Sequence, residues 1–522
     1  MQSSLKPHAA ACSGHSAVIP PPHQGTWVPL YRHLSPCSPA AASTGAAKAR
    51  PPPSLADLLR QDQLRVDHIH MRLLSSSSQG VRVSKQKQGP VKEPVRSEVI
   101  HLHDQPVIQV TIGSERKGAS GGSGGSGDQQ QSQAAGVVQT VVLDTASDVP
   151  WVQCHPLASS ATTDSSSSSY DPARSSTYYA LACNSAACTE LGRLYRGACV
   201  NNQCQYRVPI PSSPASSSSS GTYGSDLLKL TADPADGASM SFKFGCSHGE
   251  AKQGGEGSID NATAGIMALG GGPESLVSQN AAMYGSAFSY CIPATESRRP
   301  GFFVLGGGVG DLSGAGGYAV TPMLRYARVP TLYRVRLLAI AVDGQQLNVT
   351  PSVFASGSVL DSRTAITRLP PTAYQALREA FRSRMAMYRE APPQGNLDTC
   401  YDFAGAFLVM VPRVALLLDG NAVVALDRQG ILFHDCLVFT SNTDDRMPGI
   451  LGNVQQQTME VLYNVGGVLI SMIDDLRLQL AGCRPAGLLQ ATTPASSTQN
   501  IYYKFQTWHL LFGSLCCGKL SS

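Results

Sequence analysis

Two short segments of this chain repeat one pattern, an apolar run followed by a single aspartate and a hydroxyl residue. The first contains Leu143-Asp144-Thr145, and the second contains Leu360-Asp361-Ser362, 217 residues further along. Such a repeat predicts two similar halves, each of which supplies one carboxylate. Two carboxylates that meet can share one proton, so that one serves as a base and the other as an acid. Asp144 and Asp361 are therefore the candidate functional pair.

The composition favours a β-rich chain with several domains. Of the 522 residues, 42% are hydrophobic and 15% are charged, whereas the usual charged share is about a quarter. Serine, glycine and alanine make up the difference, and short apolar runs separated by Gly, Ser and Pro extend from Val137 to Cys483. This pattern predicts an all-β protein, and the length predicts two to four domains.

Helical periodicity is confined to a few stretches. The spacing of apolar residues predicts helices over residues 53–74, 273–284 and 371–388, and alternation predicts a strand within 97–112. Residues 1–52 are predicted to be disordered, and the Gly/Ser/Gln-rich insert at 113–135 is flexible by composition. The basic helix at 53–74 leaves two interpretations open, an inhibitory prosegment or a solvated charged helix.

The net charge of +4 is unevenly distributed. Residues 48–98 contain ten Lys/Arg and five Asp/Glu, whereas residues 99–522 contain 28 basic and 31 acidic residues. The basic excess therefore belongs to one N-terminal segment and not to a nucleic-acid-binding face, and no motif for nucleic acid or phosphate binding accompanies it. We expect no nucleic-acid partner.

Ten of the fourteen cysteines lie between Cys154 and Cys483. Spacings such as Cys183-x4-Cys188 do not fit a zinc pattern, so we expect no metal and interpret these cysteines as a disulfide framework formed in an oxidising compartment. Sequons at Asn261 and Asn348 agree with a secreted glycoprotein.

Neither a membrane span nor a signal peptide is predicted. No apolar stretch reaches 18 residues, and residues 1–30 contain no apolar run of seven or more. Either the natural start of the chain lies elsewhere, or secretion is lost.

A series of motifs resembles the pepsin-like family, and more closely its plant nepenthesin-like branch. The resemblance extends from about residue 28 to Cys483, and its order and spacing make it specific. It is carried by Asp144-Thr145-Ala146-Ser147-Asp148 with Trp151-Val152-Gln153-Cys154, Asp171-Pro172, Ser175-Ser176-Thr177-Tyr178, Phe244-Gly245-Cys246, Phe288-Ser289-Tyr290-Cys291, Leu397-Asp398-Thr399-Cys400-Tyr401-Asp402-Phe403 and Ile450-Leu451-Gly452-Asn453-Val454-Gln455-Gln456. Val28-Pro29-Leu30 resembles the start of that branch's prosegment.

The resemblance implies a bilobal, mainly β fold with a few short helices. Residues 1–97 would be a disordered N-terminus with a prosegment-like region, 98–325 the lobe with Asp144, 326–483 the lobe with Asp361, and 484–522 an unstructured tail. Thr145 and Ser362 would tie the two loops together beneath the aspartates. Water held between the aspartates would attack a peptide or protein substrate bound in the interlobe cleft, and no cofactor would be needed. The protein would be a monomer, and it would be secreted or vacuolar.

The resemblance also implies four disulfides, Cys183–Cys204, Cys188–Cys199, Cys291–Cys483 and Cys400–Cys436. Cys154 and Cys246 each lack their usual partner, which leaves two possibilities for them, a substitute bridge or two free thiols.

Three departures from the family pattern bear on activity. Ala146 and Arg363 stand where the family has glycine, which allows close backbone approach and lets its N–H reach the opposite carboxylate. A guanidinium at Arg363 would favour ionised carboxylates, although the mechanism needs one proton retained. The flap tyrosine is replaced by Ile210, within a stretch of prolines that cannot donate to a hairpin. In the family, a glycine also packs under the aspartate loop of each lobe. The second lobe has it as Gly452, whereas the first lobe has Ala268 at the equivalent position.

Three functions compete. The intact Asp144 and Asp361 favour an aspartic endopeptidase of impaired activity, with Arg363 as the main block. Arg363 and Ile210 favour a catalytically inactive homologue that serves as a binding or inhibitor module, as plant xylanase inhibitors do. The missing signal peptide and the unusual tail would also suit a decayed gene product.

Overall fold

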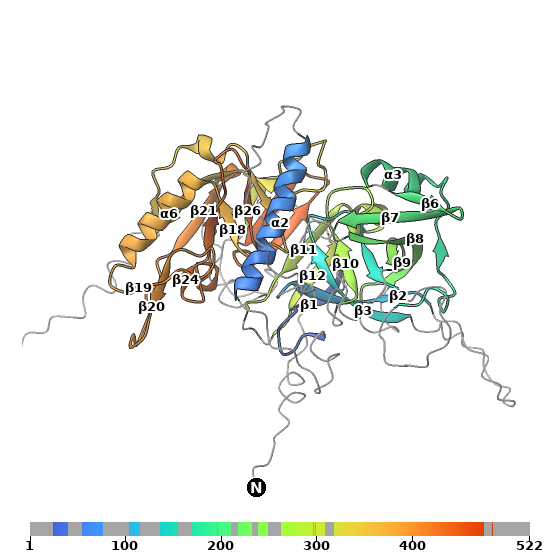
Figure 1. Cartoon of the computed structure of the whole chain (residues 1–522), viewed down its shortest axis with the longest axis horizontal. Helices are drawn as coiled ribbons and strands as arrows, with labels where there is room; N and C mark the ends of the chain where they lie inside the picture. The colour runs from blue at the N-terminus through green and yellow to red at the C-terminus, as the bar shows by residue number, and fades with distance from the viewer. Residues whose placement is uncertain are drawn as a thin grey trace, which may run out of the picture.

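Strands dominate the structure of the chain, a computed structural model (Figure 1). It describes residues 25–39, 55–76, 104–114, 136–154, 170–195, 197–209, 218–231, 238–248, 263–295, 297, 299–307, 318–473 and 483. Within these ranges the helices are α2 (Leu55–Ser76), α3 (Ala186–Leu194), α4 (Leu276–Gln279), α5 (Ala281–Tyr284), α6 (Pro371–Arg384) and the short 3-10 turns η1 (Pro351–Phe354), η2 (Asp419–Asn421) and η3 (Arg428–Gly430). None of the described helices is long and apolar enough to span a membrane.

One large sheet links the two halves of the molecule. Its order is β13-β28-β27-β11-β12-β1-β2-β3-β10-β4-β9-β8-β7-β6, with β5 paired to β8. These strands are β1 (Gly25–Arg32), β2 (Pro106–Ile112), β3 (Val137–Asp144), β4 (Trp151–Gln153), β5 (Tyr179–Ala180), β6 (Ala198–Val200), β7 (Gln203–Pro209), β8 (Ser218–Lys229), β9 (Ser239–Ser247), β10 (Gly265–Ala268), β11 (Ala287–Cys291), β12 (Gly301–Gly306), β13 (Tyr318–Pro322), β27 (Glu460–Asn464) and β28 (Leu469–Ile473).

Three smaller sheets build the rest of the second half. Their orders are β14-β17-β26-β18-β25, β16-β15-β21-β22 and β19-β20-β24-β23. The strands are β14 (Arg334–Val335), β15 (Leu337–Val342), β16 (Gln345–Gln346), β17 (Ser358–Leu360), β18 (Thr367–Leu369), β19 (Arg389–Ala391), β20 (Cys400–Asp402), β21 (Val414–Leu418), β22 (Ala422–Ala425), β23 (Leu432–Phe433), β24 (Cys436–Leu437), β25 (Phe439–Ser441) and β26 (Gly449–Leu451). Helix α6 covers β15 and β25 with Ala373, Leu377 and Phe381, which are buried.

The two halves contain the same three-strand unit. In the first, β3 pairs in parallel with β10, which pairs antiparallel with β4. In the second, β17 pairs in parallel with β26, which pairs antiparallel with β18. Each aspartate motif begins where the first strand of its unit ends, as the repeat in the sequence predicts. The bilobal, mainly β fold is therefore confirmed, and the lobe bounds 98–325 and 326–483 remain our proposal.

Strand β1 corrects the prediction of disorder over residues 1–52. It lies inside the large sheet, paired antiparallel with β12 on one edge and with β2 on the other. Val28, Leu30 and Arg32 alternate toward the interior, with exposed fractions of 2%, 0% and 1%. Arg32 donates from Nε to Pro293 O at 2.8 Å and from Nη1 to Asn453 Oδ1 at 3.2 Å. The composition of residues 1–52 favours disorder, and the strands that pair with β1 are distant in sequence. Local sequence patterns therefore did not reveal this strand.

Helix α2 lies between the two halves, and runs across the region where their sheets meet (Figure 1). The sequence favours a helix here because no proline or glycine interrupts Leu55–Ser76 and most of its residues are good helix formers. The prediction of a helix over residues 53–74 is confirmed. The observed bounds, Leu55–Ser76, differ from the predicted ones by two residues at each end. The helices expected within 273–284 and 371–388 also form, the first as two short helices, α4 and α5.

The cysteines form the predicted framework with one exchange of partners. Cys291–Cys483 and Cys400–Cys436 are joined as expected, and Cys154 pairs with Cys246 as the substitute bridge. The structure instead joins Cys183 to Cys199 and Cys188 to Cys204, so the pairing that we expected for these four is wrong. The cause is α3, which packs on β7 and brings Cys188, in its first turn, against the buried Cys204.

Candidate active site

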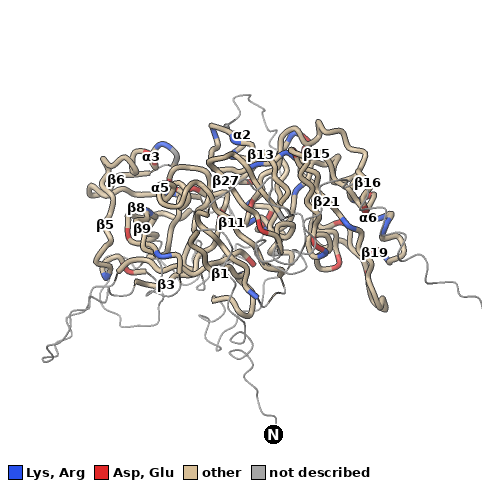
Figure 2. Tube along the Cα trace, turned by 180° about the vertical axis from the view of Figure 1, so that it is seen from behind, with Lys and Arg blue, Asp and Glu red and all other residues tan. Residues whose placement is uncertain are grey.

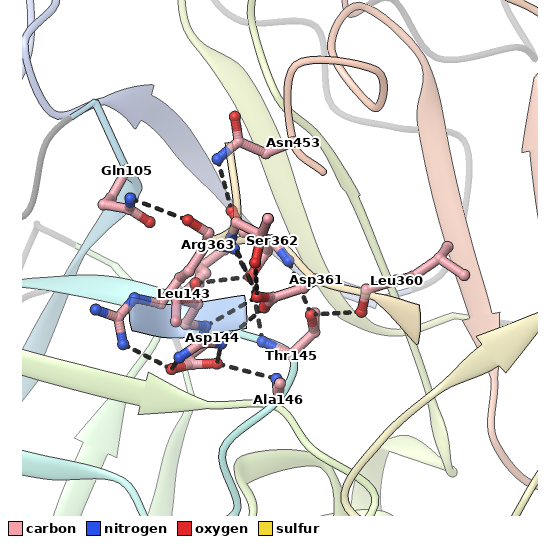
Figure 3. A network of polar contacts seen from close by, with 12 residues as sticks. Gln105, Leu143, Asp144, Thr145, Ala146, Leu360, Asp361, Ser362, Arg363 and Asn453 are labelled. Atoms are coloured by element: carbon pink, nitrogen blue, oxygen red, sulfur yellow. Dashed lines mark hydrogen bonds and ion pairs between the residues drawn. The ribbon is translucent and has the colours of Figure 1, made fainter. Parts of the chain in front are cut away.

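The aspartate motifs meet where the two halves join (Figure 3). Ala268 of β10 lies in register with Asp144, and Leu269 donates its N–H to Asp144 O at 2.8 Å. In the second half, Asp361 donates its N–H to Leu451 O at 3.2 Å. Equivalent strands thus hold both aspartates. Near them, Gln105 Nε2 donates to Arg363 O at 3.1 Å.

The hydroxyl residues after the aspartates link the two loops. Thr145 donates from Oγ1 to Leu360 O at 3.2 Å, and Ser362 donates from Oγ to Leu143 O at 2.9 Å. The backbone N–H groups cross in the same way, since Ser362 N donates to Thr145 Oγ1 at 3.0 Å and Thr145 N donates to Ser362 Oγ at 3.2 Å. The structure therefore places Thr145 and Ser362 beneath the aspartates, as the resemblance implies, and fixes one carboxylate relative to the other.

Short turns orient each carboxylate. Ala146 N donates to Asp144 Oδ1 at 2.9 Å, and Arg363 N donates to Asp361 Oδ1 at 3.3 Å. Each N–H reaches the carboxylate of its own motif, not the opposite one that the resemblance assigns to the family's glycine, because the residues are two apart in a tight turn. Thr364 adds its N–H at 3.1 Å and its hydroxyl at 2.6 Å to Asp361 Oδ2. Replacement of glycine therefore leaves these backbone donors in place.

A guanidinium from α2 occupies the space between the two carboxylates. Arg65 Nη2 donates to Asp144 Oδ1 at 2.6 Å and to Asp361 Oδ1 at 2.7 Å. Arg65 Nη1 also donates to Asp144 Oδ2 at 3.0 Å, and Arg65 Nε donates to Asp361 Oδ2 at 2.8 Å. One nitrogen atom thus contacts both carboxylates, so the two aspartates face each other across a single guanidinium group.

Arg363 adds a second guanidinium to the pair. Its Nη1 lies 2.8 Å from Asp144 Oδ2, and the side chain is buried. This ion pair agrees with the expectation that a guanidinium at Arg363 favours ionised carboxylates. Figure 2 shows acidic and basic residues meeting near the middle of the molecule, where the halves join. Two carboxylates and two guanidinium groups thus share one buried space.

The arginines determine the ionisation of Asp144. Burial alone raises the pKa of its carboxyl group, but the charges of Arg65 and then Arg363, with their hydrogen bonds, outweigh burial and hold this pKa well below its usual range. Burial likewise lowers the pKa of Arg65, and Asp144 and Asp361 outweigh it, so that the net pKa is raised. Asp144 is therefore ionised while α2 lies between the two halves.

A second acid–base contact lies one turn earlier on α2. Asp62 accepts from the N–H groups of Ala365 and Ile366 at 2.5 Å and 3.3 Å, and forms an ion pair with Arg368 Nη2 at 3.0 Å. Burial nevertheless raises the pKa of Asp62, more than Arg368 and the two N–H groups lower it. Leu59, one further turn back, packs with Ile366, Leu397 and Val454.

The other end of α2 contacts both halves. Val66 and Ile69 pack with Ala146, Val329, Leu332, Val359 and Ile450. Arg72 donates from Nη1 to Ala146 O at 3.1 Å and from Nη2 to Thr331 Oγ1 at 2.7 Å. His70 Nε2 lies 3.0 Å from Pro448 O. Burial, with the charges of Arg72 and Arg65, lowers the pKa of His68 to about 4. The solvated-helix interpretation is therefore wrong, because α2 buries one face.

Sequence reasoning missed Asp62, Arg65 and Arg368. A signal was present, because Asp62 and Arg65 interrupt the apolar stripe of Leu58, Leu59, Val66 and Ile69 on its own face. A charge inside an apolar stripe indicates a buried partner. The partner residues themselves lie more than seventy residues away in sequence, so no local pattern identifies them.

The remaining site predictions fall on different parts of the structure. The flap hairpin forms as far as the pair Pro209 and Ser218, whereas Ile210 lies outside the described residues. Asn348 is exposed, and Asn261 lies outside the described residues. Gly452 packs beneath the second loop, where a Cβ atom would lie 2.4 Å from Ala365 O. Among described residues, no cluster of three or more His, Cys, Asp or Glu could hold a metal ion.

Comparison with known proteins gives consistent matches along the chain. The family models described as xylanase inhibitor N-terminal and xylanase inhibitor C-terminal match residues 132–307 and 332–470. An aspartyl protease family protein of Arabidopsis thaliana is 32% identical over 425 residues, which are 80% of this chain and 81% of that protein. Nepenthesin-2 of Nepenthes gracilis is 29% identical, over 64% of this chain and 74% of its own length.

Solved structures of similar fold include seed globulins. Conglutin gamma, a basic 7S globulin from lupine seeds, has a TM-score of 0.52 at 18% identity, covering 72% of this chain and 97% of its own. Basic 7S globulin from soybean has a TM-score of 0.51 at 18% identity, covering 73% and 98%. At this identity the likeness shows the fold.

Proposed function

Because the chain belongs to the nepenthesin-like plant branch of the pepsin-like aspartic proteases, we propose that it is an aspartic endopeptidase held latent by α2. The observation that carries the proposal is the position of Arg65, which donates to Asp144 at 2.6 Å and to Asp361 at 2.7 Å from one nitrogen atom. The two carboxylates therefore face the same point, and that point is where a nucleophilic water molecule would have to lie.

Withdrawal of α2 would give the aspartates the geometry for peptide hydrolysis. A water molecule between them would lose a proton to one carboxylate as it attacks the peptide carbonyl carbon, while the other, protonated carboxyl group donates to the carbonyl oxygen. Collapse of the tetrahedral intermediate would pass a proton to the leaving amine. Asp144 and Asp361 would titrate as a coupled pair, and Thr145 and Ser362 would hold the loops in place.

Arg363 would reduce this activity after α2 leaves. Its Nη1 lies 2.8 Å from Asp144 Oδ2 and would keep that carboxylate ionised, whereas the mechanism needs one shared proton. Ala146 is a smaller obstacle, because its N–H already donates to Asp144 and its methyl group packs with Val66 and Ile69. We propose impaired cleavage as the consequence.

The disulfides and the plant relatives are compatible with a secreted or vacuolar protein. We extend the proposal to a monomeric, secreted zymogen that acts on peptide or protein substrates in the interlobe cleft. The exposed Asn348 would be available for glycosylation.

A second candidate function is an inactive homologue that serves as a binding or inhibitor module. The observation that favours it is the buried Arg363–Asp144 ion pair, which joins the two halves, does not involve α2 and would persist without it. The matching family models are described as xylanase inhibitor domains, which is compatible with this alternative.

An acid-pH proteolysis assay tests the two candidates. The unaltered chain, Arg363→Gly and Asp144→Asn would be compared on a denatured protein substrate, with and without pepstatin. Arg363→Gly would be assayed both alone and combined with Arg65→Leu, which frees the aspartates of α2. We expect little cleavage by the unaltered chain and partial, pepstatin-sensitive recovery in Arg363→Gly, larger in the Arg65→Leu background, because both guanidinium groups then leave Asp144. Asp144→Asn should be inactive. No recovery in Arg363→Gly combined with Arg65→Leu, with the fold retained, would favour the binding module, and brisk cleavage by the unaltered chain would disprove the impairment.

A further inference from the structure

The contacts of α2 with the cleft recur at helical spacing. Leu59, Asp62, Arg65, Ile69 and Arg72 all face the two halves, and successive members are three or four residues apart. In an extended chain, residues two apart share a face, so an extended peptide could not present this set together. The partner groups on the lobes are thus arranged for a helix.

The lengths lead to the same conclusion. Along a helix, Leu59 and Arg72 are separated by roughly 20 Å, whereas an extended chain of the same length spans roughly 45 Å. The partners of these two residues, Leu397 at one end and Thr331 at the other, therefore lie about one short helix apart. An extended peptide would reach well beyond them.

Charge in the cleft fixes the register of such a helix. Arg368 and the N–H groups of Ala365 and Ile366 receive an acidic side chain, and three residues later Asp144 and Asp361 receive a basic one. The guanidinium of Arg65 makes contacts from three nitrogen atoms, which a lysine ammonium could not reproduce. Apolar contacts at Leu59, Val66 and Ile69 surround these charges.

We propose that the interlobe cleft is a binding site for amphipathic helices that carry an aspartate three residues before an arginine, and that it accepts such a helix from another polypeptide once α2 has left. This inference rests on the proposed function only in taking the cleft as the functional site, and it requires no peptide cleavage. Residues 77–105 connect α2 to β2 and are long enough for α2 to leave without a break in the chain. Recognition follows the helix-in-groove mode, in which anchors recur every three to four residues.

Binding of a labelled peptide in trans tests this proposal. The probe is a fluorescein-labelled peptide with the sequence of residues 55–76, and the host is the full chain with Arg65→Asp, whose own α2 is repelled by Asp144 and Asp361. Fluorescence anisotropy at pH 7 should show saturable binding to this host. The unaltered chain should bind at least about tenfold more weakly, because its own Arg65 already holds the charge-assisted hydrogen bonds.

Peptide variants separate helix recognition from general affinity. Arg65→Leu in the peptide should weaken binding roughly a hundredfold, and Arg65→Lys by about tenfold, because hydrogen bonds to charged groups are lost. Val66→Pro in the peptide keeps every charge but breaks the helix, and should weaken binding by at least about a hundredfold. The matched control is Met71→Ala, because Met71 is 61% exposed, and its binding should not change.

Two outcomes would overturn the proposal. One is a Val66→Pro peptide that binds as well as the parent peptide, which would show that the cleft reads an extended chain. The other is an absence of binding to a folded host. Should Arg65→Asp impair folding, the full chain with Val66→Pro serves as the second host. Binding is measured without hydrolysis, so the two proposals can fail separately. Peptidase activity without peptide binding would leave the proposed function standing. Peptide binding without peptidase activity would leave helix binding standing.

Discussion

Replacing Arg65 with leucine should release α2 from the cleft while both halves stay folded. Its guanidinium donates to Asp144 and Asp361 at distances between 2.6 Å and 3.0 Å, and the three side chains have exposed fractions of 2%, 1% and 0%. Removing one partner of a buried ion pair costs about 3–5 kcal/mol, because the other charge is left uncompensated. Arg363 still neutralises part of that charge, so we expect about 3 kcal/mol, or roughly a hundredfold in the docking equilibrium.

Hydrogen exchange read by mass spectrometry would measure this change. Amides of α2 should exchange roughly a hundredfold faster in Arg65→Leu than in the unaltered chain, whereas amides of β3 and β17 should keep their protection. Arg60→Leu is the matched control, since it removes an exposed arginine from the same helix. Unchanged protection of α2 in Arg65→Leu would refute the reasoning, and would show that Leu59, Val66 and Ile69 hold the helix without the ion pairs.

Acidification from pH 7 to pH 4 should also loosen α2, because the pKa of His68 falls to about 4 in the docked helix through burial and the charges of Arg72 and Arg65, with Asp144 and Asp361 opposing. A released His68 takes up its proton near pH 6.5, so the free energy that favours docking of α2 falls by up to roughly 3 kcal/mol through this window. His68→Gln should remove that loss in hydrogen-exchange measurements at both pH values. Cutting the chain at a protease site introduced between residues 77 and 103 should leave residues 25–76 attached at neutral pH, because β1 pairs on both edges. Replacing the disulfide-bonded Cys37 with serine should not release them, and separate elution of the two pieces in native chromatography would contradict this. Gly452→Ala should destabilise the fold by about 1–3 kcal/mol, because the new Cβ would lie 2.4 Å from Ala365 O, and an unchanged melting temperature would count against the close approach.

Local patterns were sufficient where the structure depends on local order. The repeated aspartate motif gave the two related halves, and the apolar stripe gave α2 and α6. The place of Arg363 beside the two carboxylates also followed from the sequence, because the residue lies two positions after Asp361. Its pairing with Asp144, and not with Asp361, is a finding of the structure.

Long-range pairing accounts for what the sequence did not reveal. Strand β1 depends on β12, which lies more than 250 residues away, and its own composition resembles a disordered segment. The exchange of partners among Cys183, Cys188, Cys199 and Cys204 depends on the side of β7 against which α3 packs. Arg65 acquires its role only because the whole helix lies between the halves.

The central claim is that two arginines hold Asp144 ionised, and the titration of that carboxyl group tests it most directly. Carbon-13 NMR of selectively labelled aspartate would follow the carboxyl resonance of Asp144, assigned through Asp144→Asn. Because the pKa of Asp144 is held well below its usual range, its resonance should remain that of a carboxylate at pH values where an ordinary aspartate is protonated. The double variant Arg65→Leu with Arg363→Gly should bring the protonation into a higher pH range. Titration of Asp144 near pH 4 in the unaltered chain, where a free aspartate titrates, would contradict the account.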